Sequence, residues 1–237
     1  MHLVEQRPID NAQVNYSPPS AASLSKLAQW SEAFAPLFNG RHRPSFTTHE
    51  RAAINSLKLI ELMDYVLFSF NFSATGVEFE FDTFFIQLRE IIELGKEIVV
   101  DEELSRGQRG GDREERSMGH IAPSFTSEIR LIAPLFVVAT NCRDRILRRE
   151  TIKLLLSRPR RECLWDSIFC AEVAELIMEI EEKGMSPYDP WSQSVEEKIV
   201  RRVTIKEMVF DLQSRTGRLK YRIGGIGSEI VETAISW

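Results

Sequence analysis

The sequence has few cysteines and no long hydrophobic run, and both absences restrict what the chain can be. Its three cysteines are odd in number and stand in apolar or helical surroundings, which favours buried thiols in a reducing compartment over a disulfide framework. The longest apolar run, Leu131 to Ala139, is far below the roughly 20 residues that span a bilayer, and Pro134 interrupts it. The first ten residues lack the apolar segment of a secretory signal. We therefore expect an intracellular protein, nuclear or cytoplasmic, without a membrane segment.

The chain also lacks the short motifs of several enzyme classes. It contains no GxSxG elbow, no P-loop lysine motif and no HExxH pair. None of the four histidines forms a metal-binding pair at helical spacing, and we expect all of them on the solvated surface: His2, His42, His49 and His120. The glycine-rich Gly224–Ser228 segment loosely suggests a phosphate loop, but too little chain follows for a βαβ unit, so we interpret it as a flexible joint. The sequence predicts no catalytic residue, metal ligand or cofactor.

Length and charge allow one sizeable core. A chain of 237 residues with a formal net charge of −5 can form one large domain or two small ones. Pro8, Pro18 and Pro19 favour an extended arm over residues 1–22. We expect a helical domain over residues 23–200, and a β-hairpin with a C-terminal tail over residues 201–237.

Apolar spacing and a capping motif predict the first three helices. The first covers Ser23 to Phe38. The second begins at a capping box, in which the side chains of Thr47 and Glu50 each bind the other residue's backbone N–H, and it continues to about Phe70. Apolar residues that recur every three or four positions from Phe81 to Val99 predict an amphipathic third helix.

The segment over residues 101–122 mixes both charge signs with glycines. It cannot bury enough apolar area to offset the entropy lost on ordering, so we expect a mobile loop. Ser124 or Thr126 then caps a helix that continues to Asn141. Proline removes a backbone donor and clashes with the preceding turn, so we expect this helix to be kinked or split at Pro134.

Two further helices and a hairpin complete the expected fold. A basic helix covers Asp144 to Leu156, and an amphipathic helix covers Asp166 to Glu182. Polar and apolar residues alternate on both sides of an SRTG turn, which predicts a β-hairpin with Gly217 at a left-handed bulge position. The fold class is therefore mainly α, a bundle of antiparallel helices with a small C-terminal β-hairpin.

The stretch between Cys142 and Cys163 is strongly basic although the chain as a whole is acidic. Structural zinc needs four ligands, usually in close pairs, and neither cysteine has a second one within a few residues. Arg145, Arg149 and Lys153 fall on one helical face, where they could bind nucleic-acid phosphates. Acidic residues are interleaved and neighbouring helices supply more, so we favour a solvated or salt-bridged face.

Four segments of this region follow one another in a recognisable order: PLFVVATNCRD, ILRRETIKLLLSRPRRE, LWDS and VAELIMEIEE. The pattern resembles the C-terminal region of fungal zinc-cluster transcription factors, and the resemblance covers most of the chain between Leu24 and Ile223. Where that family usually has a glycine, this chain has Cys163. The residues that match the family's motif are Pro134, Leu135, Phe136, Cys142, Arg143, Asp144, Arg148, Arg149, Leu154, Leu155, Pro159, Arg160, Arg161, Glu162, Trp165 and Asp166.

The resemblance implies a regulatory part without its DNA-binding part. Family members usually carry an N-terminal binuclear zinc cluster of six cysteines, and this chain has none of its three cysteines there. It implies function through protein contacts, with a protein partner or a second copy, and with a small-molecule effector. It also implies that Cys142 is a buried helix residue and that Arg143, Asp144 and the later Arg–Glu pairs are hydrogen-bonded helix connectors. We expect Trp165 to be buried at the turn.

Two alternatives stay open. The helical domain could have been recruited as a small-molecule-binding protein or enzyme in a biosynthetic pathway of secondary metabolism. For the phenylalanines between Phe68 and Phe85 we favour packing in the core over a ligand pocket between helices. The chain could also be a truncated factor. In either case we expect no sequence-specific DNA binding by the chain alone, because no helix-turn-helix or finger pattern presents side chains to a groove.

Overall fold

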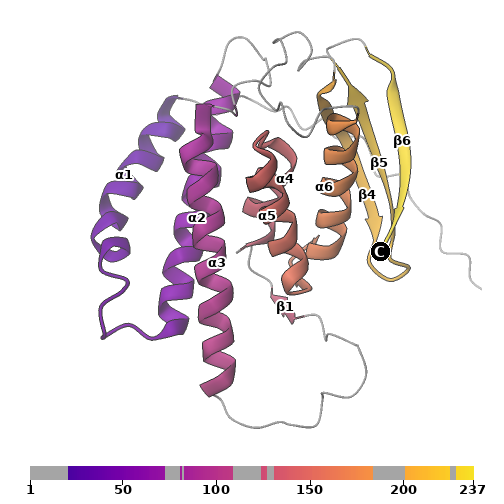
Figure 1. Cartoon of the computed structure of the whole chain (residues 1–237). Coiled ribbons are helices and arrows are strands. Elements are labelled where there is room, and N and C mark those ends of the chain that lie inside the picture. The colour runs from indigo at the N-terminus through magenta and orange to yellow at the C-terminus, as the bar shows by residue number, and fades with distance from the viewer. Residues whose placement is uncertain are drawn as a thin grey trace, which may run out of the picture.

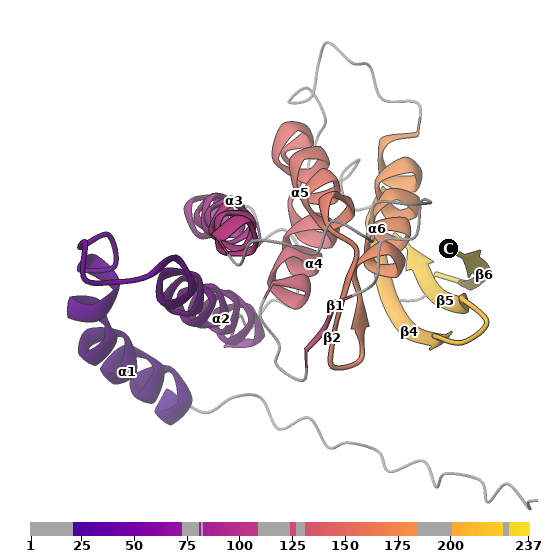
Figure 2. The same cartoon turned by 90° about the horizontal axis from the view of Figure 1, so that it is seen from below.

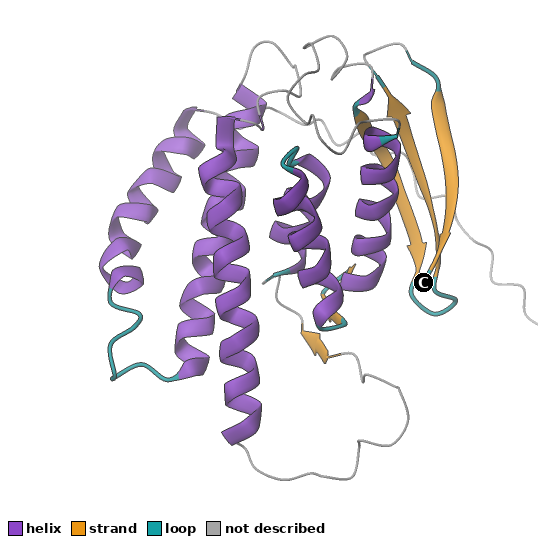
Figure 3. Cartoon of the chain, viewed as in Figure 1, coloured by secondary structure: helices purple, strands orange, loops and turns teal. Residues whose placement is uncertain are grey.

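A computed structural model describes residues 21–72, 81, 83–108, 124–126, 131–183, 201–224 and 228–237. Within these ranges the chain is mainly α, as predicted (Figure 1, Figure 3). The helices are α1 (Ala21–Asn39), α2 (Thr48–Phe72), α3 (Phe85–Gln108), α4 (Ile132–Asn141), α5 (Arg145–Ser157) and α6 (Ser167–Glu182). The strands are β1 (Ser124–Thr126), β2 (Arg160–Glu162), β3 (Trp165–Asp166), β4 (Val203–Asp211), β5 (Thr216–Ile223) and β6 (Ile230–Ser236).

The elements are arranged in space largely in their order along the chain. Two views show α1, α2 and α3 at one end, α4 and α5 in the middle, and α6 with the β4–β6 sheet at the other end (Figure 1, Figure 2). None of the described helices is both long enough and apolar enough to cross a membrane. Most of the expected arm over residues 1–22 and all of residues 109–122 and 184–200 lie outside the described ranges.

The capping box predicted for the second helix is present at the start of α2. The backbone N–H of Thr47 donates to Oε2 of Glu50 at 2.8 Å, and the N–H of Glu50 donates to Oγ1 of Thr47 at 3.2 Å. The hydrogen bonds from Thr47 lower the pKa of the Glu50 carboxyl. Helices α2 and α3 pack against each other, and both supply fully buried residues to one hydrophobic core, among them Leu59 and Ile91.

The prediction of a loop from residue 101 is wrong for residues 101–108, which form the last two turns of α3. Arginines from distant elements hold this end of the helix. Arg51 of α2 donates to Oδ1 of Asp101 at 2.9 Å, and Arg160 of β2 donates to Oε2 of Glu102 at 2.8 Å. These ion pairs stabilise a segment whose own composition cannot build a core, and composition alone could not reveal them.

The predicted start of the helix before Asn141 is also wrong. Ser124 and Thr126 belong to β1, which pairs in parallel with β2, and α4 begins only at Ile132. Pro134 is therefore in the first turn of α4. The backbone N–H groups of a first turn have no partner within the helix, so proline is tolerated there and the expected kink or split does not arise.

The predicted hairpin is present and forms part of a larger sheet. Strand β4 pairs antiparallel with β5, and β5 pairs antiparallel with β6, a strand in the segment expected to be a tail. The left-handed residue of the turn is Arg215, with φ of 52°, and not Gly217. Gly217 lies within β5, where an added Cβ would come within 2.9 Å of Cε2 of Phe169. Its missing side chain lets α6 pack against the sheet.

Candidate functional site

Most of the basic stretch forms α5 (Arg145–Ser157), whose limits lie within one residue of the predicted Asp144 and Leu156. Asp144 caps it, since the backbone N–H groups of Ile146 and Leu147 donate to its Oδ1 at 3.0 and 2.9 Å. On the apolar face of the helix, Leu147, Thr151 and Leu155 are buried and Leu154 is half-buried. The apolar face of α5 therefore packs inward, and its arginines bind carboxylates of other elements.

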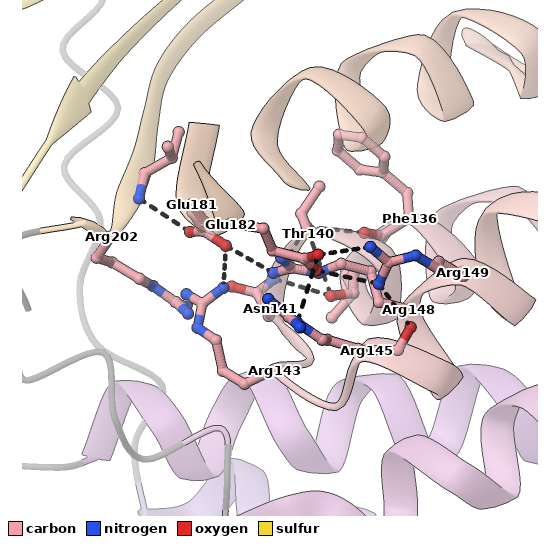
Figure 4. Close-up of polar contacts among 12 residues, drawn as sticks. Phe136, Thr140, Asn141, Arg143, Arg145, Arg148, Arg149, Glu181, Glu182 and Arg202 are labelled. Carbon is pink, nitrogen blue, oxygen red and sulfur yellow. Dashed lines mark hydrogen bonds and ion pairs between the residues drawn. The ribbon is translucent and has the colours of Figure 1, made fainter. Parts of the chain in front are cut away.

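A buried glutamate at the end of α6 binds the first group of arginines (Figure 4). Arg143, which precedes α5, and Arg148 both donate to Oε2 of Glu181. The distance from Arg148 Nη2 is 2.7 Å, and the Arg148 side chain is only 2% exposed. The other oxygen, Oε1, accepts from the backbone N–H of Val203 at 3.0 Å. One carboxylate thus joins α5, α6, the α4–α5 connection and the first residue of β4.

Glu182, the residue after Glu181, binds two of the three cations that were expected to share one face of the basic helix, Arg145 and Arg149. Arg149 makes a two-pronged pair with Glu182, with Nη1–Oε1 and Nη2–Oε2 distances of 3.2 and 2.5 Å. Arg145 lies 3.5 Å from Oε2 of the same carboxylate. Lys153, the third residue of that face, is exposed. Two of the three cations are therefore salt-bridged within the chain, which is the interpretation that the sequence favoured.

The second half of the motif makes a tight hairpin between α5 and α6. Arg161 donates to Oδ2 of Asp166 at 3.0 Å, while Oδ1 of Asp166 accepts from the first backbone N–H groups of α6. Cys163 has φ of 54°, a left-handed conformation that favours glycine. Cys163 and Leu164 form the two-residue loop between β2 and β3, and only Cys163 has a positive φ, as in a type II′ turn. Glycine is the residue that such a turn prefers.

Trp165 is half-buried, although we expected it to be buried. Its ring lies 5.5 Å from that of Phe136, measured between centroids. Pro159, which follows α5, is also half-buried. The indole packs on α4 but keeps part of its surface in solvent, because β3 is at the edge of the small β1–β2–β3 sheet.

Glu162 is the most deeply buried carboxylate of the motif, with no exposed surface. Its Oε2 accepts from the backbone N–H groups of Leu131 and Ile132 at 2.8 and 2.9 Å. A negative charge at a helix N-terminus is favourable, since the first N–H groups have no partner within the helix. Glu162 is therefore the cap of α4, and Arg160 lies 3.9 Å from its other oxygen.

In the described part of the chain the cysteines and histidines form no metal-binding group. Cys142 is buried, as predicted, with 2% exposed, whereas Cys163 is exposed. Burial, followed by the charges of nearby carboxylates, raises the pKa of the Cys170 thiol well above its ordinary range, so it is a poor nucleophile. Among the described residues no three histidine, cysteine or acidic side chains are placed to hold a metal ion. His42 and His49 are exposed, and the other two histidines lie outside the described ranges.

The acceptors of this network were not identified from the sequence. Glu181 and Glu182 end the motif segment VAELIMEIEE, so a signal for them was present, but their pairing with α5 depends on how α5 and α6 pack. Arg202 was not identified either; its Nη2 donates to Oδ1 of Asn141 at 3.2 Å. Arginine does not lose its proton in proteins, so the network is suited to holding elements together rather than to moving protons.

The geometry of the motif is thus that of a set of ion-paired connectors between α3, α4, α5, α6 and β4. Comparison of the chain with family models, with curated proteins and with solved structures found no match.

Proposed function

We propose that this chain is a transcription-regulator-like helical domain without a DNA-binding module of its own, which acts through protein contacts and responds to a small-molecule effector. The proposal follows the resemblance to the regulatory region of fungal zinc-cluster factors. The observation that carries it is that each of the five matched arginines binds a carboxylate inside the chain: Arg143, Arg148, Arg149, Arg160 and Arg161.

Internal pairing makes the basic helix a poor surface for phosphates. For Arg149 to bind DNA it would have to leave Glu182, whose side chain is only 14% exposed. A carboxylate that loses its partner while it is partly buried is destabilised, so the exchange is unfavourable. Lys153 alone on this face would give at most weak contacts that fade as salt rises. This supports regulation through a partner protein rather than through direct contact with DNA.

Two measurements test the proposal. Fluorescence anisotropy with labelled duplexes of different sequence should show no sequence-selective binding by the full chain at physiological salt. Fusion of the chain to an unrelated DNA-binding module should change expression of a reporter that carries the module's site. Sub-micromolar, sequence-selective binding by the chain alone would overturn the proposal, as would a folded fusion that leaves the reporter unchanged.

A matched pair of variants tests the observation behind it. Glu182→Gln removes the negative charge that pairs with Arg145 and Arg149, while Glu150→Gln removes a charge on α5 that pairs with Lys96 of α3. Both change the net charge equally. Only Glu182→Gln should clearly strengthen non-specific DNA binding and steepen its salt dependence, by about 0.9 in log–log slope for each arginine that gains a phosphate. Equal effects of the two variants would show that net charge alone decides binding.

A further inference from the structure

Strand β6 is a sheet edge without the features that usually protect one. Among the described residues it pairs only with β5, on one side. Its seven residues, IVETAIS, contain no proline and no lysine. The single charge, Glu232, is balanced inside the chain, because Arg218 donates to its Oε1 at 3.3 Å and Lys220 lies 4.0 Å from its Oε2. Edge strands present free backbone groups, and monomeric proteins usually block them with prolines, charges or bulges.

The opposite edge of the same sheet, β4, does have these features. A register shift between Ile205 and Glu207 bends the strand, and the exposed Lys206 lies within it. The strand also ends in Asp211, a charged and exposed residue. Bulges and lysines at an edge discourage pairing with another chain. The two edges therefore differ, and the open one is β6.

The two faces of β6 are also distinct. Val231, Thr233 and Ile235 lie opposite three buried residues of β5, so they share the face that packs on α6. Ile230, Glu232, Ala234 and Ser236 lie on the outer face and are exposed, whereas on the inner face Thr233 and Ile235 are half-buried and only Val231 is exposed. A strand that extends the sheet must keep this alternation, because residues directly opposite each other in antiparallel strands lie on the same face.

We propose that β6 pairs antiparallel with β6 of a second copy of this chain, across a two-fold axis at Thr233, to give a continuous six-stranded sheet. This register uses all seven residues. It places Val231 opposite Ile235 of the second copy, Thr233 opposite Thr233 and Glu232 opposite Ala234. Apolar pairs and threonine pairs stabilise neighbouring strands.

Other registers that keep the inner face of one copy beside the inner face of the other are less favourable. A two-fold axis at Glu232 places the two glutamates directly opposite each other, and like charges there are destabilising. An axis at Ala234 or at Val231 leaves residues of the strand without a partner. The sequence of β6 is thus self-complementary in one register, and this is why the partner is a second copy rather than an unrelated strand.

The inference rests in part on the proposed function, because it names the partner for one of the proposed protein contacts. Its test uses no transcription assay, so the two can fail separately. A single pair of seven-residue strands is a small interface, so we expect a dimer that forms in the micromolar range and dissociates on dilution. Sedimentation of the full chain over about 1–500 µM measures this equilibrium.

Charge variants at Ala234 test the register. Ala234→Glu places like charges opposite each other twice, against Glu232 of the other copy, and should weaken the dimer by about 2-fold to 30-fold. Ala234→Lys places opposite charges there and should strengthen it. Within one copy the effects have the reverse sign, because Ala234 lies opposite Arg218 of β5. Loss of the dimer in Ala234→Glu therefore cannot be explained by a destabilised fold.

Val209 supplies the matched control, since it is exposed on β4 and lies opposite the same Arg218 from the other side. Val209→Glu and Val209→Lys introduce the same charges beside the same arginine, at the blocked edge, and should leave the dimer unchanged. A chain that is monomeric throughout the concentration range overturns the proposal. So does a dimer that is indifferent to the charge at residue 234, or one that responds equally at residue 209.

Discussion

The guanidinium of Arg148 donates to the Glu181 carboxylate at 2.7 Å, and the two side chains are 2% and 7% exposed. Loss of one partner of such a pair leaves a buried charge without compensation. We expect Arg148→Ala to lower the free energy of unfolding by about 3–5 kcal/mol, towards the lower end because Arg143 also binds Glu181. Denaturant unfolding measures the change. The control is Arg149→Ala, whose side chain is 46% exposed and which should cost about 1 kcal/mol or less. Equal losses in the two variants would contradict the assignment.

Cys163 gives a second prediction, because its φ of 54° is costly for any residue with a Cβ. Cys163→Gly should raise the free energy of unfolding by about 0.5–1 kcal/mol, less than the full strain since glycine also gains entropy in the unfolded chain. Cys163→Ala removes the thiol but keeps the Cβ, so it should bring no gain. If alanine stabilises the chain as much as glycine does, the thiol and not the backbone is responsible.

The same substitution, glycine to alanine, should have different effects on stability at Gly217 and at Gly95. At Gly217 an added Cβ would lie 2.9 Å from the Phe169 ring and 3.0 Å from the carbonyl oxygen of Val209, so Gly217→Ala should cost about 1–3 kcal/mol. At Gly95, inside α3, the near atoms are the methyl ends of leucine side chains at 3.0–3.3 Å, which need to shift by only a few tenths of an ångström. Alanine also favours the helix there by up to about 1 kcal/mol. Thermal unfolding should therefore show a clear loss for Gly217→Ala and little change for Gly95→Ala.

Asp64 of α2 makes stability depend on pH. Burial raises the pKa of its carboxyl above the ordinary value of 3.8, so the folded chain binds this proton more tightly than the unfolded chain does. The contribution of Asp64 to the free energy of unfolding therefore falls as pH rises from 3.8 through the raised pKa of the folded chain. At neutral pH the ionised, partly buried carboxylate stays destabilising. Asp64→Asn should therefore stabilise the chain at pH 7 and lose this advantage in acid.

Asp211 is the control with the opposite sign. Hydrogen bonds from the Gln213 backbone N–H and the Ser214 hydroxyl lower the pKa of its carboxyl. It contributes stability above the ordinary value of 3.8, which is lost as pH falls through the lowered folded value. Asp211→Asn should therefore destabilise the chain at pH 7 and lose this effect in acid. Parallel pH profiles for Asp64→Asn and Asp211→Asn would contradict both assignments.

Local signals in the sequence predicted the elements whose stabilising contacts are local. The caps of α2, α5 and α6 come from Thr47, Asp144 and Asp166, each directly beside its helix, and these helices begin where the sequence indicated. The start of α4 could not be predicted in this way. Its cap, Glu162, follows 30 residues later in the chain and reaches it only because β2 folds back beside the helix.

The same distinction explains the candidate site. The arginines of the motif were identified, since they lie in sequence order, but their acceptors depend on tertiary packing. The end of α3 shows this for the fold, because Asp101 and Glu102 are ordered by Arg51 and Arg160, which are about 50 residues or more away. Strand β6 was missed because its edge position leaves both faces partly exposed, which blurs the alternation that marks a half-buried strand.

The bond from the Val203 backbone to Glu181 has a consequence for how the molecule loses its structure. Separation of the β4–β6 sheet from the helices would deprive Glu181 of this donor and expose the Phe169 ring, which packs against Phe210 and Trp237. The free energy needed to separate the sheet from the helices is therefore a large part of the free energy of complete unfolding. We expect the helices and the sheet to melt in a single cooperative transition, so that calorimetric and van't Hoff enthalpies agree.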